Sequence, residues 1–548
     1  MISFLFLGLT LSTLCVFAVP LVERAAPIVT LDGATFTGIT SGTNTKFLGI
    51  PFAQPPLGDL RYRLPAPITY SNGTFDATEY GPSCGQQIIK LPSSIINGLV
   101  ADAANYVIGS VFGQVFPDDE DCLTVNVVKP ASAKSTAKLP VVVWIFGGGF
   151  ELGSTSMYDG GLIVDRSQEL SQPVIYVSMN YRLTGFGFLG GQEIKSAGVG
   201  NLGLQDQRQA LRWIQKYISQ FGGDPTKVTI WGESAGAISA SLQMLTNGGN
   251  TEGLFRGAFL ESGAPIPVGD IINGQKYYDA LVKDTGCSGA ADTLQCLRTV
   301  PYTALKAAIN NSPGIFDYQS LNLAWLPRTD GVFLTDNPQK LVAAGKVAAI
   351  PYIVGNCDDE GTLFSLANAN VTTDAQFKTY IQKTFLPGIT DAQTTQIATL
   401  YPSDITQGSP FDTGILNAVT PQFKRLAAFQ GDGVFQGPRR WLLQYTASTQ
   451  NVWVFLSKRL KLLPALGSVH ASDILNVYGG GEMGDHLIRF VNNLNPNPST
   501  GYQWPQYTLA TRKIATYIDG IIPVITGTDT FRTEAIDYLT QVTLVNPV

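Results

Sequence analysis

The segment Phe221-Gly-Gly-Asp-Pro-Thr-Lys-Val-Thr-Ile-Trp-Gly-Glu-Ser-Ala-Gly236 predicts a strand, a sharp turn and a helix in immediate succession. The run Lys227–Trp231 has the β-branched, apolar character of a strand, and small and apolar residues suited to a helix follow Gly236. Between them, Gly-Glu-Ser-Ala-Gly matches a nucleophile elbow, whose tight backbone lifts the serine hydroxyl out of the sheet. We therefore predict that Ser234 is a nucleophile.

The pentapeptide alone is weak evidence, because a chain with 57 glycines matches Gly-x-Ser-x-Gly by chance. A second match, Gly81-Pro-Ser-Cys-Gly85, illustrates this. No β-run precedes Ser83, and Pro82 restricts the residue before it. Ser83 is therefore expected to be a loop residue.

Short apolar runs recur along the chain, and several are separated by helix-like stretches. Residues 204–221 carry apolar side chains at helical spacing and end before Gly222. This alternation predicts an α/β fold with a large, mostly parallel central sheet flanked by helices. Ligands of such sheets collect at the carboxyl ends of strands. The runs predicted as strands are Leu139–Phe146, Pro173–Met179, Lys227–Trp231, Ala258–Glu261, Ile350–Val354 and Val452–Leu456.

A serine hydroxyl needs a base within hydrogen-bond reach, and the chain offers two histidines, His470 and His486. His470 follows the last strong strand in a stretch of small and polar residues, whereas His486 lies at an apparent helix start, so we predict His470. In this fold class the acid comes between the serine and the histidine. Asp358, Asp359 and Glu360 all follow a predicted strand, and spacing does not choose among them.

The oxyanion of an ester intermediate needs N–H donors. Gly147-Gly148-Gly149-Phe150 follows a predicted strand and offers main-chain N–H groups with no side chain to block approach. We predict donors at Gly148 and Gly149 and at the amide of Ala235. No metal or organic cofactor is needed for this chemistry. A glycine turn that only packs is the structural alternative.

Composition places further bounds on function. The net charge of −6 argues against nucleic acid as a partner. Residues 1–18 are apolar and end in a small-residue site, which predicts a signal peptide, with residues 19–26 as a possible pro-segment and 27–548 as one catalytic domain. Secretion permits disulfides and fits sequons at Asn72, Asn310 and Asn370. No later segment is apolar enough for a membrane anchor.

The chain resembles the type-B carboxylesterase/lipase family, most closely the secreted fungal lipases and sterol esterases. The resemblance covers nearly the whole mature chain and is carried by Phe47–Pro56, Glu120–Asn126, Gly147–Phe150, Phe221–Gly236, Asp359–Thr362 and His470–Asp473. It implies an α/β-hydrolase fold with Ser234 as nucleophile, Glu360 as acid and His470 as base. It also implies the disulfides Cys84–Cys122 and Cys287–Cys296 and a salt bridge between Arg61 and Glu120. Cys357 matches no feature of the family.

The span from Gly85 to Pro117 is densely apolar, and its only charges are Lys90 and Asp102. It is either ordinary core or, as the resemblance implies, a lid within residues 85–121 that meets lipid when open. An apolar lid favours long-chain esters such as acylglycerols or sterol esters and a lipid–water interface as partner. On the same grounds Phe364 is a predicted acyl-pocket wall, with buried packing as the alternative.

Two alternative functions and one alternative assembly state remain. Some relatives of this fold are adhesion molecules without a nucleophile, but here all three positions of the triad are filled. A broad-specificity carboxylesterase or feruloyl-type esterase that acts on plant-wall or other small esters is the second enzyme hypothesis. An apolar lid also permits a homodimer that buries it.

Overall fold

The computed structural model describes residues 25–89, 99–111 and 117–548. The predicted signal peptide lies outside the described residues, as does most of the possible pro-segment. Eleven strands form one sheet in the order β14-β13-β12-β11-β10-β9-β7-β8-β6-β4-β3. The central pairs from β13 to β8 are parallel, and the pairs at both edges are antiparallel. This is the mostly parallel sheet that the sequence predicts.

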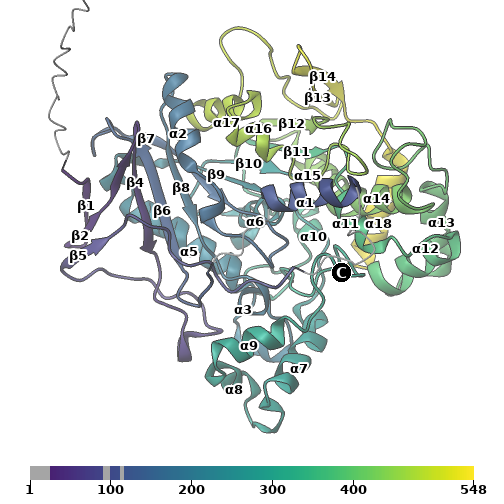
Figure 1. The fold of residues 1–548 in the computed structure, drawn as a ribbon, viewed down its shortest axis with the longest axis horizontal. Coiled ribbons are helices and arrows are strands. Elements are labelled where there is room, and N and C mark those ends of the chain that lie inside the picture. The colour runs from purple at the N-terminus through teal and green to yellow at the C-terminus, as the bar shows by residue number, and fades with distance from the viewer. Residues whose placement is uncertain (1–24, 90–98, 112–116) are drawn as a thin grey trace, which may run out of the picture.

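The strands of this sheet are β3 (Ile39–Ser41), β4 (Asn44–Pro51), β6 (Thr124–Pro130), β7 (Leu139–Ile145), β8 (Ile175–Met179), β9 (Gly223–Glu233), β10 (Gly257–Glu261), β11 (Tyr352–Cys357), β12 (Val452–Ser457), β13 (Lys513–Tyr517) and β14 (Val524–Thr528). All six predicted runs are among them. A small second sheet has the order β1-β2-β5 and lies beside one edge in Figure 1. Its strands are β1 (Ile28–Leu31), β2 (Ala34–Thr37) and β5 (Gly73–Asp76).

Helices cover the sheet and extend around it (Figure 1). The predicted helix over residues 204–221 is α5, which continues into a 3₁₀ turn at Ile218–Phe221. Helices that pack next to the sheet or to the site described below include α2 (Gly160–Glu169), α5 (Leu202–Tyr217), α6 (Ala235–Gln243), α11 (Thr362–Ser365), α14 (Phe423–Gly431), α15 (Gly437–Thr446), α17 (Glu482–Asn493) and α18 (Thr533–Val545). The helices α7 (Gln275–Asp284), α8 (Thr293–Thr299) and α9 (Tyr302–Ile309) form a group at the lower edge of Figure 1.

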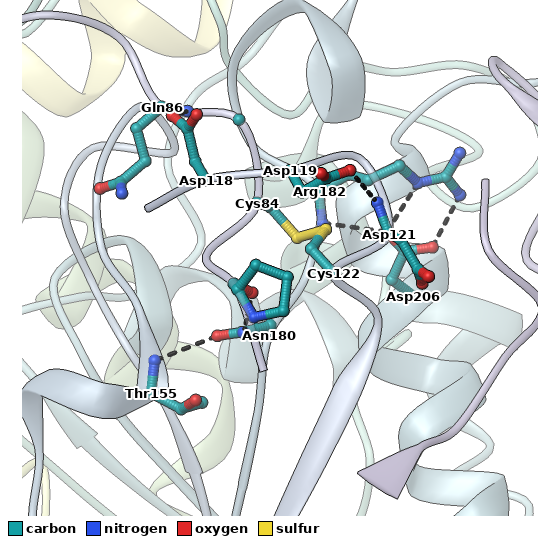
Figure 2. The surroundings of a disulfide bond; sticks show 12 residues. Cys84, Gln86, Asp118, Asp119, Asp121, Cys122, Thr155, Asn180, Arg182 and Asp206 are labelled. Atoms are coloured by element: carbon teal, nitrogen blue, oxygen red, sulfur yellow. Dashed lines mark hydrogen bonds and ion pairs between the residues drawn. A yellow bond between two sulfur atoms is a disulfide. The ribbon is translucent and has the colours of Figure 1, made fainter. Parts of the chain in front are cut away.

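Both predicted disulfides are present, Cys84–Cys122 and Cys287–Cys296. Figure 2 shows Cys84 and Cys122 joined through their sulfur atoms, with Asp119 and Asp121 nearby. Next to this bond, Arg61 and Glu120 form a buried ion pair with a 2.6 Å contact from Nε to Oε1. The disulfide and the ion pair together fix both ends of the 85–121 segment.

Within that segment the structure describes α1 (Leu99–Val111), where Ala103, Ala104 and Ile108 are buried. The predicted helix start near residues 92–94 lies outside the described residues. In the described parts of the chain, no helix combines the length and the apolar character needed to cross a membrane.

Two of the three sequons are open to solvent. Asn72 and Asn370 are exposed, whereas Asn310 is partly buried and its Oδ1 accepts a hydrogen bond from the N–H of Ile88. Glycosylation at these positions stays a prediction.

Candidate active site

Ser234 lies on a strained turn between β9 and α6. Its φ of 54° is in the left-handed region, which a residue with a side chain rarely adopts. The turn needs glycine on either side: a Cβ at Gly232 would lie 2.4 Å from the carbonyl carbon of Gly236, and one at Gly236 would lie 1.9 Å from the carbonyl oxygen of Ile145. The Gly-x-Ser-x-Gly pattern is therefore required by backbone packing.

Three side chains from distant parts of the chain meet at this turn. Nε2 of His470 lies 2.8 Å from Oγ of Ser234, and Nδ1 of His470 lies 2.5 Å from Oε2 of Glu360. All three residues are buried. The other carboxylate oxygen of Glu360 accepts a hydrogen bond from the N–H of Cys357, which orients the acid. A serine, an imidazole and a carboxylate in this order allow the serine hydroxyl to attack an ester carbonyl.

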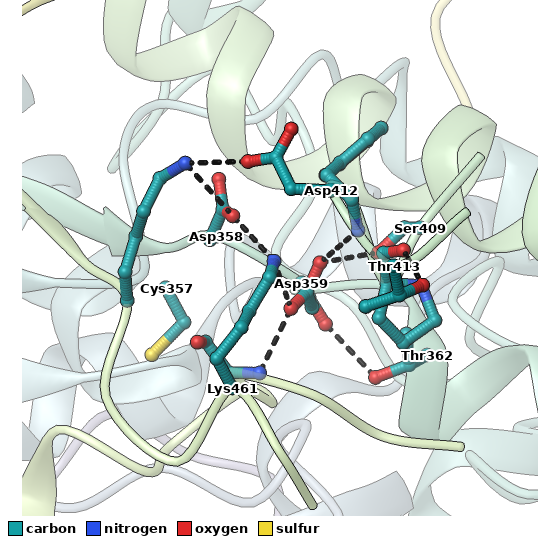
Figure 3. Close-up of polar contacts among 12 residues, drawn as sticks. Cys357, Asp358, Asp359, Thr362, Ser409, Asp412, Thr413 and Lys461 are labelled. Atoms are coloured by element: carbon teal, nitrogen blue, oxygen red, sulfur yellow. Dashed lines mark hydrogen bonds and ion pairs between the residues drawn. The ribbon is translucent and has the colours of Figure 1, made fainter. Parts of the chain in front are cut away.

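The structure separates the three adjacent acids that spacing left open. Glu360 faces His470, whereas Asp358 and Asp359 both face Lys461, with contacts of 2.6 Å and 2.7 Å to its Nζ (Figure 3). Asp359 also accepts hydrogen bonds from Ser409, Phe411 and Ser468. These two aspartates therefore hold loops together, and one acid remains for the histidine.

More buried carboxyl groups surround His470 than the triad uses. Burial and the nearby acids raise the pKa of Glu233 and Glu261 well above the usual range and raise that of Asp473 to about 7. Both oxygens of Glu233 and both of Asp473 make no hydrogen bond with any described side chain or backbone group. Glu233 and Glu261 are therefore largely uncharged near neutral pH and Asp473 is partly so, whereas Glu360 is the carboxyl group in direct contact with Nδ1 of the imidazole.

The predicted oxyanion loop lies directly against Ser234. A Cβ at Gly147 would lie 2.9 Å from the Cβ of Ser234. Gly148 and Gly149 have positive φ angles of 104° and 64°. Among the described residues, the N–H groups of Gly148, Gly149 and Ala235 donate no hydrogen bond. These three groups are thus available to a substrate oxygen.

A pocket with about 720 Å³ of empty space, including the part open to solvent, lies next to Ser234, and its walls are almost entirely apolar. The predicted wall residue Phe364 lines it, with its ring 5.1 Å from the His470 ring. Phe435 was not predicted, although it lies closer to His470, at 4.6 Å. It belongs to a π-helical turn, η10 (Asp432–Gln436), between α14 and α15. Such π-helical turns inside α-helices often occur at functional sites.

The remaining sequence candidates lie away from the reacting atoms. His486 is in α17, where its Nδ1 pairs with the Tyr517 hydroxyl, and burial lowers its pKa to about 4. The Cys357 thiol is buried, and burial raises its pKa, which disfavours the nucleophilic thiolate. Ser83 lies in a loop, as predicted, paired with Asp118 by a single β-bridge.

Comparison with known proteins gives a consistent result. Residues 25–519 match the carboxylesterase family. The chain belongs to this family. It is 44% identical to Lipase 4 of Diutina rugosa over 94% of this chain and 96% of that protein. It is 43% identical to Secreted lipase 1 of Botryotinia fuckeliana over 95% and 94% of the two chains. The crystal structure of Aspergillus niger EstA superposes with a TM-score of 0.80 at 28% identity, covering 96% and 99% of the two chains.

Membership of the carboxylesterase family makes this protein a carboxylic ester hydrolase with the α/β-hydrolase fold. The predicted fold class and enzyme class are thus confirmed. The family assignment says less about the acyl group and the alcohol, which depend on the pocket and on the segment between Cys84 and Cys122.

Proposed function

We propose that this protein is a secreted lipase that hydrolyses long-chain lipid esters through an acyl-enzyme on Ser234. The observation that carries the proposal is the apolar pocket that begins at the serine. A pocket lined by phenylalanine, leucine and isoleucine side chains offers a long acyl chain much buried apolar contact and offers a short, soluble ester little. The names of relatives also favour it, among them a secreted triacylglycerol lipase of Gibberella zeae.

In the proposed reaction, Ser234 attacks the ester carbonyl while Nε2 of His470 takes its proton. The carboxylate of Glu360 favours the tautomer with a proton on Nδ1 and stabilises the imidazolium that forms. The N–H groups of Gly148, Gly149 and Ala235 stabilise the oxyanion. The alcohol then leaves with the histidine proton, and water repeats the sequence on the acyl-enzyme.

Hydrolysis of triolein, cholesteryl oleate and methyl ferulate, measured side by side on the full-length secreted protein, tests the substrate class. We expect turnover of triolein or cholesteryl oleate to exceed that of methyl ferulate. A preference for the ferulate, or a steep optimum at acetyl in a p-nitrophenyl ester series, would overturn the lipid proposal and favour a small-ester carboxylesterase. Ser234→Ala is expected to abolish turnover and labelling by a fluorophosphonate, and near-normal turnover would refute the mechanism.

A further inference from the structure

Glu151 directly follows the oxyanion loop and is one of the most buried acids in the described chain, with 1% of its surface exposed. Its Oε2 accepts a hydrogen bond of 2.8 Å from the N–H of Ile315. Its Oε1 has no hydrogen-bond partner among the described residues, which also provide it with no ion pair. Burying a carboxyl group without a cation is costly, so its retention next to the oxyanion loop needs an explanation.

Three segments meet at Glu151. The carbonyl oxygen of Glu151 accepts a hydrogen bond of 3.0 Å from the N–H of Gln87, in the segment that follows Cys84. The Gln87 amide in turn donates to the carbonyl oxygen of Ser312 at 2.8 Å. Gln86 accepts a hydrogen bond from the N–H of Gly153. The oxyanion loop, the start of the disulfide-closed segment and residues 312–317 are therefore tied together around Glu151.

The bond to Ile315 affects the reacting end of the pocket. A Cβ at Gly149 would lie 2.6 Å from Cδ1 of Ile315, so the isoleucine packs directly on the oxyanion loop. Gly149 and Ile315 both line the pocket that begins at Ser234. The next residue, Phe316, stacks on Phe364 with a ring separation of 6.4 Å. Displacing residues 315–316 would thus alter both the loop that holds the oxyanion donors and the wall next to His470.

We propose that Glu151 is a positioning residue, which holds Ile315 against Gly149 and so sets the shape of the oxyanion loop and of the adjoining pocket wall. The inference rests on the proposed function, because it assigns Gly149 to the oxyanion site. Glu151 acts through its neighbours and does not touch the substrate.

The protonation state of Glu151 provides a signature that simple packing lacks. Burial raises the pKa of its carboxyl to about 8, and the nearby Asp317 adds to the rise. Asp317 is the charged group that faces it from residues 312–317, while Gln86 and Gln87 on the entry segment are uncharged and the rest of the oxyanion loop does not titrate. Near pH 7 the group is therefore mostly a neutral acid, which glutamine imitates in shape and charge.

A second, small cavity lies next to Glu151 and is also lined by Gln87 and Asp317. Oε1 of Gln87 is buried and, like Oε1 of Glu151, lacks a partner among the described residues. A proton on the Glu151 carboxyl adds a donor to a site in which both unpaired side-chain oxygens, Oε1 of Glu151 and Oε1 of Gln87, are otherwise acceptors. Ionisation removes this donor and leaves an unpaired buried charge between Ile315 and Gln87.

The test compares Glu151→Ala, Glu151→Gln and, as a matched control, Glu534→Gln, which changes an exposed acid at the start of α18. Rates are measured on p-nitrophenyl butyrate and palmitate from pH 6 to pH 9. We expect Glu151→Ala to lower kcat on both esters, on the order of 10-fold, because the oxyanion loop shifts. Glu151→Gln is expected to match the wild type at pH 6 and to exceed it at pH 9.

Thermal unfolding supplies an independent readout if Glu151→Ala does not fold. The unfolded carboxyl loses its proton near pH 4.5 and the folded one near pH 8, so wild-type stability falls as the pH rises through this window. The melting temperature of Glu151→Gln relative to the wild type should rise over the same window, with no such trend for Glu534→Gln. An unchanged kcat in Glu151→Ala, or a flat trend for Glu151→Gln, would overturn the inference. If Ser234→Ala keeps its activity, the proposed function itself fails.

Discussion

Oε1 of Glu233 lies 3.2 Å from Nε2 of His470, the same nitrogen that faces the Ser234 hydroxyl. The imidazole is thus in contact with two glutamates, one at each ring nitrogen. The two differ in environment: Glu360 accepts a hydrogen bond from a backbone N–H, whereas both oxygens of Glu233 lack hydrogen bonds within the described structure. Burial raises the pKa of Glu233 well above its usual range, so it is a neutral acid near pH 7.

The difference between the two glutamates predicts a large loss of kcat when Glu360 is replaced by glutamine and a small change when Glu233 is. Glu360→Gln removes the charge that stabilises the imidazolium and changes the favoured tautomer, so kcat should fall about 1,000- to 10,000-fold. Glu233→Gln replaces a neutral acid by a neutral amide of the same shape, and kcat should stay within about 10-fold of the wild type. Steady-state hydrolysis of p-nitrophenyl butyrate at pH 7 measures both. Equal losses in the two variants would contradict the assignment of roles.

Asp359 is expected to matter for stability more than for chemistry. Its oxygens accept hydrogen bonds from the Ser409 hydroxyl and from the N–H groups of Phe411 and Ser468, and Lys461 pairs with it (Figure 3). Asp359→Asn replaces one carboxylate oxygen by an NH₂ group that faces hydrogen-bond donors. It also leaves Lys461 with Asp358 as its remaining acidic partner. The free energy of unfolding should fall by about 3–5 kcal/mol, as when one member of a buried pair is removed.

Denaturant unfolding of Asp359→Asn measures this loss, and kcat far below the melting temperature should fall less than about 10-fold. Glu360→Gln, the neighbouring substitution, is the control with the reverse pattern. A catalytic defect in Asp359→Asn as large as that of Glu360→Gln would show that the adjacent acids share the histidine.

The elbow was predictable from sequence because its constraint is local. A serine with positive φ needs glycine at the positions where Gly232 and Gly236 stand, and the flanking strand and helix have short-range patterns. The six predicted strands are buried and apolar, and the structure contains all of them. The antiparallel edge strand β14 was missed because it is largely exposed and has no long apolar run.

Other features depend on contacts between distant segments, which spacing does not encode. Asp358, Asp359 and Glu360 are consecutive, so spacing did not choose among them and only the family resemblance implied Glu360. In the structure, His470 contacts Glu360, and Lys461 on a remote loop pairs with the two aspartates. Glu151 gave no signal, because an acid next to a glycine loop looks solvated until residues 312–317 cover it. Phe435 was missed for a similar reason, since its contact with His470 depends on a π-helical turn.

The α18 side of the pocket next to Ser234 offers a test of chain-length selection. Leu539 in α18 lines the pocket and packs next to Gly433, where a Cβ would lie 3.2 Å from Cδ2 of Leu539. Leu539→Trp fills the α18 side of the pocket with a larger side chain. The preferred p-nitrophenyl ester should therefore shift to shorter acyl chains, with butyrate turnover retained. We expect the ratio of palmitate to butyrate kcat/KM to fall about 10-fold or more.

Val545→Trp is the matched control, because Val545 lies on the same helix and is 76% exposed. Its ratio of palmitate to butyrate turnover should equal that of the wild type. If Leu539→Trp also keeps the wild-type ratio of palmitate to butyrate turnover, long acyl chains do not reach α18.

Asp529 predicts how the fold responds to acid. It is fully buried between Arg439 and Arg440, with 2.7 Å contacts to both. Burial alone would raise its pKa, but the two guanidinium groups outweigh this and hold the pKa of the carboxyl far below its usual range. Arg439 also donates to Asn356 on β11 and to Gln436 in η10, so the pair connects the sheet to the turn that carries Phe435.

Because the folded pKa is depressed, the stability from Asp529 is fully present above the unfolded value near 3.8 and is lost as the pH falls toward the folded value. Asp529→Asn should therefore lower the free energy of unfolding by about 3–5 kcal/mol at pH 7, since Arg439 is left buried without its anion. The deficit relative to the wild type should shrink below about pH 4, where the wild type begins to lose the same contribution. Urea unfolding at pH 3, 5 and 7 measures this, with the exposed Asp537→Asn on α18 as control. A deficit that stays constant down to pH 3 would mean that the substitution acts through shape and not through the buried charge.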